Sequence, residues 1–267
     1  MHRTRRAGDR GEGTTGGGMT PEPEENPRLH LVHCTSVERG RSIVDEGLKP
    51  GTEDRTNYDA NRWMPLDGVY LSVCDDQILQ YRRAHALQDY ALVLVEADAR
   101  RLLPDEDIVD VLLHRAYLHC TGPLDRDRDI PPPGDAFWDG VRDRFVESAG
   151  PRSDAPLRDG DLDEVVDWWA DYEYFGEGGD IDPFEWAALK DRIVRAFPHL
   201  EGSCPTERSK RFPGTIGFEG DVRIVAVVEC SGGTAGIIRG CVPDEAVRMV
   251  ERMIDGHLGV DAPALAA

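Results

Sequence analysis

The sequence predicts an α+β protein in which helices are segregated around a small sheet. Strand-like apolar runs lie towards both ends of the chain, and a long acidic segment of helical character separates them. The steady alternation of strand and helix typical of a Rossmann domain does not occur, and neither Gly-x-Gly-x-x-Gly nor a Walker loop is present. We therefore expect a small mixed sheet with a helical, acidic insertion.

Residues 1–27 combine Gly, Thr, Pro and Glu with almost no apolar side chains. Such a segment cannot bury enough surface to offset its ordering entropy, so it is predicted to be a disordered leader. Met19 lies within it as an alternative start. The leader lacks the apolar stretch of a signal peptide, which favours a cytoplasmic protein.

The first structured elements are predicted directly after this leader. Alternating apolar side chains predict a strand over residues 28–33. Thr35-x-x-Glu38 is a capping box that predicts a helix start, and Gly47 followed by Pro50 predicts its end.

Two more strands are predicted in the N-terminal half. Residues 68–73 alternate in polarity, whereas residues 90–96 are apolar on both faces and predict a central strand covered on both sides. A helix is predicted between them, over residues 75–88. Residues 100–110 are interpreted as a turn that leads away from the sheet.

Residues 121–205 are predicted to be an acidic, aromatic-rich helical insertion. Residues 121–200 contain 20 acidic and 9 basic side chains. Seven aromatic residues lie between residues 161 and 186: Trp168, Trp169, Tyr172, Tyr174, Phe175, Phe184 and Trp186. So many aromatic side chains favour either internal packing or a surface for a protein partner over a solvated linker.

The C-terminal part returns to strand character. Residues 222–229 and 234–239 predict two strands joined by a Ser-Gly-Gly turn, and Pro243 predicts the first turn of a helix that ends near Ile254. We expect residues 28–120 and 206–260 to form one domain around the insertion, followed by a loose tail over residues 261–267.

Charge and cysteine content exclude several classes of protein. With 51 acidic and 31 basic residues, the chain of 267 residues has a net charge of -20 and no sequence-wide footprint for nucleic acid. The acidity and the scarcity of lysine resemble proteins of salt-loving archaea, with a GC-rich genome as the rival explanation.

Apolar runs are strand-sized, so no membrane span is expected. The six cysteines lack metal-site spacing and are predicted to be small buried thiols: Cys34, Cys74, Cys120, Cys204, Cys230 and Cys241.

Three motifs occur in a characteristic order near the N-terminus. Leu-Val-His33-Cys-Thr35 ends a predicted strand, Gly47-Leu closes a predicted helix, and Val-Tyr70-Leu-Ser72 forms the next strand. This order resembles the ADP-ribosyltransferases of the His-Tyr-Glu type, which include diphtheria-toxin-like toxins, poly(ADP-ribose) polymerases and toxins that modify DNA. The resemblance implies split mixed or antiparallel sheets, two small sheets that form an NAD cleft between them. It also implies release of nicotinamide and transfer of ADP-ribose to a macromolecular acceptor, protein or nucleic acid.

Carried over residue by residue, the resemblance assigns NAD-binding roles to four residues. His33 matches the histidine that hydrogen-bonds the nicotinamide ribose, with Thr35 beside it. Tyr70 matches the tyrosine that stacks on nicotinamide, and Ser72 projects from the same strand face. An aromatic ring can hold a flat cationic ring by about 0.5 to 2 kcal/mol, which agrees with these assignments.

The family also implies a catalytic glutamate near the start of a late strand, where a carboxylate stabilises an oxocarbenium-like transition state. Glu219 is the first candidate, and Glu207 and Glu229 are the alternatives. The chain departs from the family here, because neither Gln-x-Glu nor Glu-x-Glu occurs. Arg211, in the cluster Arg-Ser-Lys-Arg over 208–211, is a candidate for the NAD pyrophosphate or a nucleic-acid acceptor, with a solvated loop as the alternative.

Other readings of these residues stay open. His33 can be a structural histidine, Tyr70 a core aromatic residue, and Glu219 a turn residue. The chain can then be an inactive NAD-binding relative, an interaction protein that binds through residues 161–186, or an acidic-cluster metal hydrolase. The series Asp159-x-Asp161-x-Asp163 suggests calcium, but the glycine and glutamate of an EF-hand loop are missing, so no metal is expected.

Overall fold

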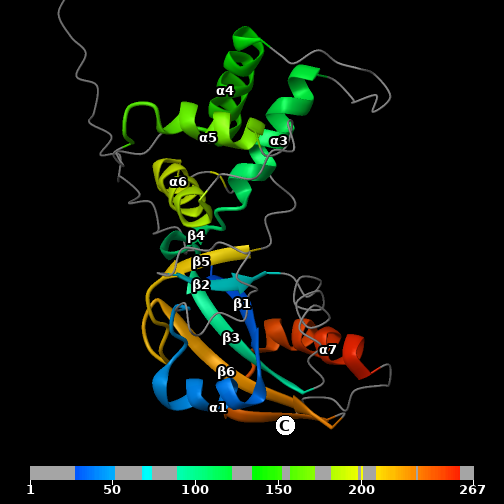
Figure 1. The fold of residues 1–267 in the computed structure, drawn as a ribbon. Coiled ribbons are helices and arrows are strands. Elements are labelled where there is room, and N and C mark those ends of the chain that lie inside the picture. The colour runs from blue at the N-terminus through cyan, green and yellow to red at the C-terminus, as the bar shows by residue number, and fades with distance from the viewer. Residues whose placement is uncertain are drawn as a thin grey trace, which may run out of the picture.

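The structure is a computed structural model, and it describes residues 28–51, 68–73, 89–121, 134–151, 157–171, 182–197, 200, 209–232 and 234–258. The predicted leader, the predicted helix over residues 75–88 and the predicted tail lie outside these residues. The described chain is an α+β protein, as the sequence predicts (Figure 1).

All seven described strands belong to a single sheet in the order β4-β5-β2-β1-β3-β6-β7. The strands are β1 (Arg28–Thr35), β2 (Gly68–Ser72), β3 (Tyr90–Asp98), β4 (Leu103–Pro104), β5 (Ser209–Pro213), β6 (Val222–Ser231) and β7 (Thr234–Gly240). Every pairing among them is antiparallel, so the described part of the chain contains no mixed sheet. The expected split into two sheets is wrong for the described strands, because β1 and β2 pair with each other and join all seven into one sheet.

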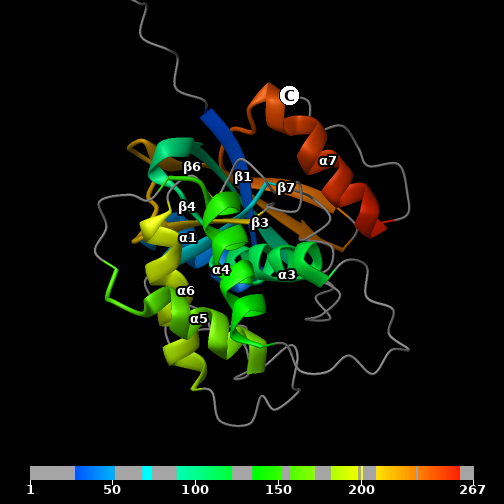
Figure 2. The same ribbon diagram turned by 90° about the horizontal axis from the view of Figure 1, so that it is seen from above.

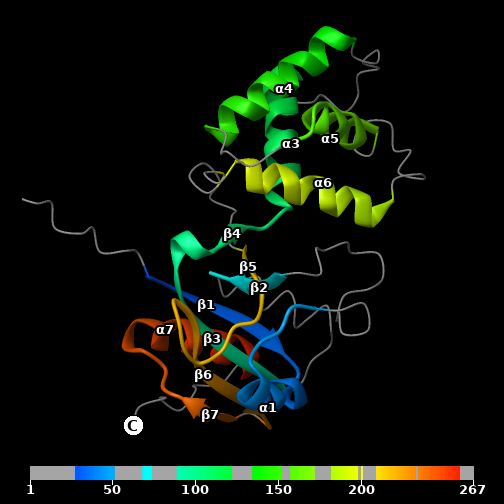
Figure 3. The same cartoon turned by 90° about the vertical axis from the view of Figure 1, so that its left-hand side faces the viewer.

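The central position predicted for residues 90–96 is confirmed by β3. It pairs along its length with β1 on one side and β6 on the other. Helix α1 (Val37–Glu46) covers one face, where Ile43 packs with Leu31 and Val93. Helix α7 (Asp244–Leu258) covers the opposite face (Figure 3). Because both faces are covered by helices, an apolar run without alternation is the pattern this strand needs.

Helix α1 begins one residue later than the capping box predicts. The Ser36 side chain accepts a hydrogen bond from the backbone N–H of Arg39 at 3.3 Å, whereas Thr35 is still part of β1 and pairs with Ala91. Both residues suit an N-cap position. The β1–β3 pairing extends through Thr35 and so decides between them. The predicted helix end is confirmed, since Gly47 takes a positive φ of 76° at the C-cap.

The helical character predicted for the insertion is confirmed in its described residues. The helices are α3 (Ile108–Thr121), α4 (Asp135–Ala149), α5 (Asp161–Ala170) and α6 (Pro183–Ala196), and we call them together the helical unit. They share one core that includes Leu113, Phe145 and Ile193. Helix α3 begins at Ile108, so the helical unit begins earlier than the predicted boundary at residue 121. It adjoins the β4-β5-β2 end of the sheet (Figures 1 and 2).

Most of the described aromatic residues of the insertion pack inside the helical unit. Trp169 and Trp186 are buried, and Trp168 lies 6.0 Å from Trp186 between ring centroids. Phe184 is exposed. Of the two predicted roles for the aromatic residues, internal packing therefore applies to these three tryptophans, whereas residues 172–175 lie outside the described chain.

Two further predictions can be compared with the described residues. Cys34 and Cys230 are buried as expected, but Cys120 and Cys241 are exposed, so the prediction of uniformly buried thiols is wrong. In the portion of the chain that the structure covers, no helix combines the length and apolarity needed to cross a membrane.

Candidate functional site

The sheet is almost divided between β1 and β2. These strands are joined by one residue pair, Val32 with Ser72, whereas β1 pairs with β3 over all its residues. On the other side, β2 pairs with β5 along its whole length. The sheet thus consists of a small part, β4-β5-β2, and a larger part, β1-β3-β6-β7, that meet at a narrow junction.

His33 and Tyr70 lie together at this junction. The Nδ1 atom of His33 is 3.0 Å from the backbone oxygen of Tyr70. A carbonyl can only accept, so Nδ1 carries the proton and donates it. Burial lowers the pKa of His33 and favours the neutral imidazole, which leaves Nε2 as a hydrogen-bond acceptor.

The two side chains leave the sheet on different faces. Val69 and Leu71 pack with Leu31 in the core under α1. Because side chains alternate along a strand, Tyr70 projects to the opposite face, and His33 shares the face of Leu31. A ligand that contacts both the imidazole and the phenol must therefore lie across the junction between β1 and β2.

The Tyr70 hydroxyl donates a hydrogen bond of 2.6 Å to Oε1 of Glu106. Glu106 lies in the turn between β4 and α3 and is only 1% exposed. Burial, reinforced by the charge of Asp105, raises the pKa of Glu106 to about 7 although the Tyr70 hydrogen bond opposes it. Burial also raises the pKa of Tyr70, so the phenol stays protonated while Glu106 exchanges its proton near neutral pH.

Arg211 completes this buried polar group. It lies on β5 directly opposite Tyr70, and its side chain is fully buried. Its guanidinium binds the carboxylate of Asp191 on α6, and its Nε lies 4.0 Å from Oε2 of Glu106. Gly68 makes room for the arginine stem, because a Cβ at that position would lie 2.5 Å from the Cγ and Cδ atoms of Arg211.

The basic cluster predicted at residues 208–211 is therefore not an exposed loop in its described part. Lys210 and Arg211 belong to β5, and both are buried. The Arg211 guanidinium, proposed from sequence for the NAD pyrophosphate or a nucleic-acid acceptor, is engaged by carboxylates of the chain itself. A phosphate group would have to displace Asp191 to reach it.

Lys190 on α6 binds acidic residues in and next to the turn that carries Glu106. Its ammonium lies 2.9 Å from Asp107 and 2.9 Å from Asp110, and although burial lowers its pKa, these two carboxylates raise it above the ordinary value. The carboxylate oxygens of Asp105, Glu106 and Asp107 lie within 4.8 Å of one another, a spacing that suits a divalent cation. Lys190 and Arg211 already supply positive charge to this group, so we assign it a structural role.

The remaining predicted site residues are dispersed. Thr35 is buried in β1, and Ser72 lies at the junction. Glu219 is exposed in the turn before β6. Glu229 lies on β6, where Arg41 of α1 binds both of its carboxylate oxygens at 2.8 Å. Glu207 lies outside the described residues.

Glu106 is the carboxylate that contacts the Tyr70 side chain, and the sequence did not single it out. The run Pro-Asp-Glu-Asp over residues 104–107 has the composition of a surface turn. Glu106 is buried whereas the next residue, Asp107, is exposed. This difference in burial is visible only in the folded chain.

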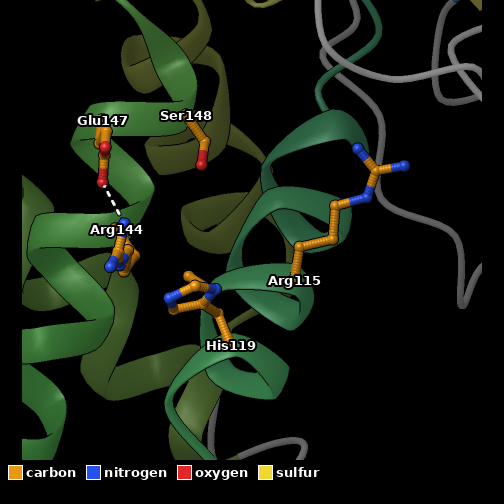
Figure 4. A pocket seen from close by; sticks show the side chains of 6 residues that line it. Arg115, His119, Arg144, Glu147 and Ser148 are labelled. Carbon is orange, nitrogen blue, oxygen red and sulfur yellow. Dashed lines mark hydrogen bonds and ion pairs between the residues drawn. The ribbon is translucent and has the colours of Figure 1, made fainter. Parts of the chain in front are cut away.

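A separate cavity of about 340 Å³ lies between α3 and α4 (Figure 4). It is lined by Arg115, Ala116, His119, Arg144, Glu147 and Ser148, and none of these residues belongs to the sheet. Arg144 donates to Glu147 at 2.6 Å, and the Arg115 guanidinium points away from His119. The cavity is thus not part of the junction that holds His33 and Tyr70.

Comparison of the chain with protein-family models, with curated proteins and with solved structures found no match.

Proposed function

We propose that this protein is an NAD-dependent ADP-ribosyltransferase with its nicotinamide site at the junction between β1 and β2. The observation that carries the proposal is the pairing of His33 with Tyr70 at the one place where β1 and β2 are joined by a single residue pair. The resemblance assigns these two residues to the nicotinamide end of NAD and implies that NAD binds in a cleft between two small sheets.

The chemistry of the two side chains supports this use. Neutral His33 offers Nε2 as an acceptor for a ribose hydroxyl, since its Nδ1 proton is held by Tyr70. The half-buried Tyr70 ring can stack on the cationic nicotinamide with about 0.5 to 2 kcal/mol. In the reaction the bond between ribose C1′ and the nicotinamide nitrogen breaks, nicotinamide leaves with the bonding electrons, and a nucleophile of the acceptor bonds to C1′ and loses its proton.

The proposed acid is Glu219, with Glu106 and Glu229 as alternatives. A carboxylate near the ribose stabilises positive charge that develops only in the transition state. Glu219 is exposed and not bound to a cation in the described contacts. Glu229 is held by Arg41, and Glu106 is partly protonated at neutral pH because of its raised pKa.

The test is release of nicotinamide from NAD by the purified full-length protein, measured by chromatography. We expect Tyr70→Ala and Glu219→Gln each to lower the rate at least about tenfold, the loss of roughly 1.4 kcal/mol of transition-state stabilisation. Phe184→Ala and Glu164→Gln remove an exposed aromatic ring and an exposed glutamate of the helical unit and serve as matched controls.

The outcomes separate the candidates. Full activity of Glu219→Gln, with loss in Glu106→Gln or Glu229→Gln, would move the acid to that residue. Binding of NAD without release of nicotinamide, with every acceptor supplied, would make the chain an NAD-binding module. No binding of NAD would refute the proposal, and labelled NAD incubated with cell lysate would identify the class of acceptor.

A further inference from the structure

The Tyr70 ring is connected to the helical unit by two hydrogen bonds and, between them, by a longer charge contact of 4.0 Å from Nε of Arg211 to Oε2 of Glu106. Its hydroxyl donates to Glu106, Glu106 faces Arg211, and Arg211 binds Asp191 of α6. Glu106 and Arg211 are 1% and 0% exposed, so solvent does not compete for these contacts.

The turn that carries Glu106 is held by the same helix. Lys190, the neighbour of Asp191 on α6, binds Asp107 and Asp110 at 2.9 Å each. Both flanks of the Glu106 carboxylate are thereby fixed by α6, one through Arg211 and one through the backbone of the turn. A movement of α6 relative to the sheet would displace Glu106 and, with it, the Tyr70 hydroxyl.

We propose that Glu106 is a positioning residue, which orients the Tyr70 ring for nicotinamide and couples that ring to the helical unit. The inference rests on the proposed function, because it assumes that Tyr70 contacts NAD. Tyr70 is a half-buried side chain with two rotatable bonds, and its hydroxyl is the only polar atom by which the ring can be held. The short hydrogen bond to a buried carboxylate restricts both rotations.

A positioning role predicts a defined kinetic signature. A misoriented ring loses stacking in the ground state and in the transition state alike, so KM for NAD should rise while kcat changes little. We expect Glu106→Ala and Tyr70→Phe each to raise KM about tenfold. Glu106→Gln, whose amide oxygen can still accept from the hydroxyl, should raise KM less than about threefold.

The decisive experiment is a double-mutant cycle between Glu106→Ala and Tyr70→Phe, with nicotinamide release as the readout. If the two residues act through one hydrogen bond, the double variant has about the same KM as either single variant. The control is Asp161→Ala, which removes a buried acid of the helical unit that is bound by Arg192 and not by Tyr70. Circular dichroism tests whether each variant is folded. If Glu106→Ala is not, Glu106→Leu, which fills the space of the side chain but cannot accept from the hydroxyl, takes its place in the cycle with Tyr70→Phe.

Failure of this inference differs from failure of the proposed function. If the wild type releases nicotinamide but the effects on KM add, or Asp161→Ala matches Glu106→Ala, Glu106 is not a positioning residue. If the wild type binds NAD without releasing nicotinamide, calorimetric affinities take the place of KM in the same cycle, and coupled losses still support the inference. If the wild type binds no NAD, both proposals are wrong.

Discussion

Glu106 should make the stability of the folded protein depend on pH near neutrality. Burial raises its pKa from 4.5 to about 7. The folded chain therefore holds a proton that the unfolded chain has already released. A raised pKa gives a contribution to stability that is complete below the unfolded value of 4.5 and is lost as the pH rises through about 7. Glu106→Gln, which has nearly the same shape and does not titrate, should remove this dependence.

The magnitude follows from the two pKa values. Each tenfold difference in proton affinity is about 1.4 kcal/mol, so a pKa of about 7 against 4.5 amounts to about 3 kcal/mol in total. About 2.5 kcal/mol of this lies between pH 5 and pH 8. Because the neighbouring acids are present in both proteins, their own titration largely cancels in the difference between wild type and Glu106→Gln.

Urea unfolding of both proteins at several pH values between 5 and 8 measures this difference. Relative to the wild type, Glu106→Gln should gain about 2 to 3 kcal/mol in free energy of unfolding over that interval. Tyr70→Phe keeps the Glu106 carboxyl group but removes the hydrogen bond that lowers the pKa of Glu106. The stability of this variant should therefore still depend on pH, with the change shifted to higher pH. If the free energies of unfolding of wild type and Glu106→Gln differ by the same amount at pH 5 and at pH 8, Glu106 does not titrate in this interval.

Two further predictions concern the packing that supports the site. Gly40→Ala should lower the free energy of unfolding by about 1 to 3 kcal/mol, because the new Cβ would lie 2.3 Å from the Cβ of Ala91 and displace α1 from β3. In Gly217→Ala the new Cβ meets no atom within 4 Å, and equal thermal midpoints for the two variants would contradict the prediction. Replacing both Asp107 and Asp110 by Asn should lower the free energy of unfolding, measured with urea, by about 3 to 5 kcal/mol, because the buried Lys190 ammonium loses both carboxylates. Adding Lys190→Met should restore most of the lost stability, and no restoration would show that the unpaired buried charge is not the cause.

Local patterns were sufficient for much of the framework. The continuous apolar run at residues 90–96 predicts a covered central strand, and Gly47 predicts a helix end, because each depends on the properties of a few neighbouring residues. The helix start was less well defined. Thr35 and Ser36 are both suitable caps, and pairing of Thr35 with Ala91, far along the chain, selects Ser36.

The candidate site depends far more on distant contacts. His33 and Tyr70 could be proposed from motif order, but that the imidazole binds the Tyr70 backbone follows from the narrow junction of two strands. Arg211 lies opposite Tyr70 because β5, 141 positions later, pairs with β2. Its burial removes it from the exposed basic cluster that the sequence suggested.

By itself, the sequence determined the α+β class, the positions of most strands, the helical nature of the insertion and the two residues, His33 and Tyr70, on which the functional proposal depends. Only the tertiary structure decided which acid meets Tyr70. An acidic turn such as residues 104–107 has the same composition whether it faces solvent or the protein interior. The pKa and partners of Glu106 are set by burial and by charges brought from β5 and α6, which are properties of the assembled fold.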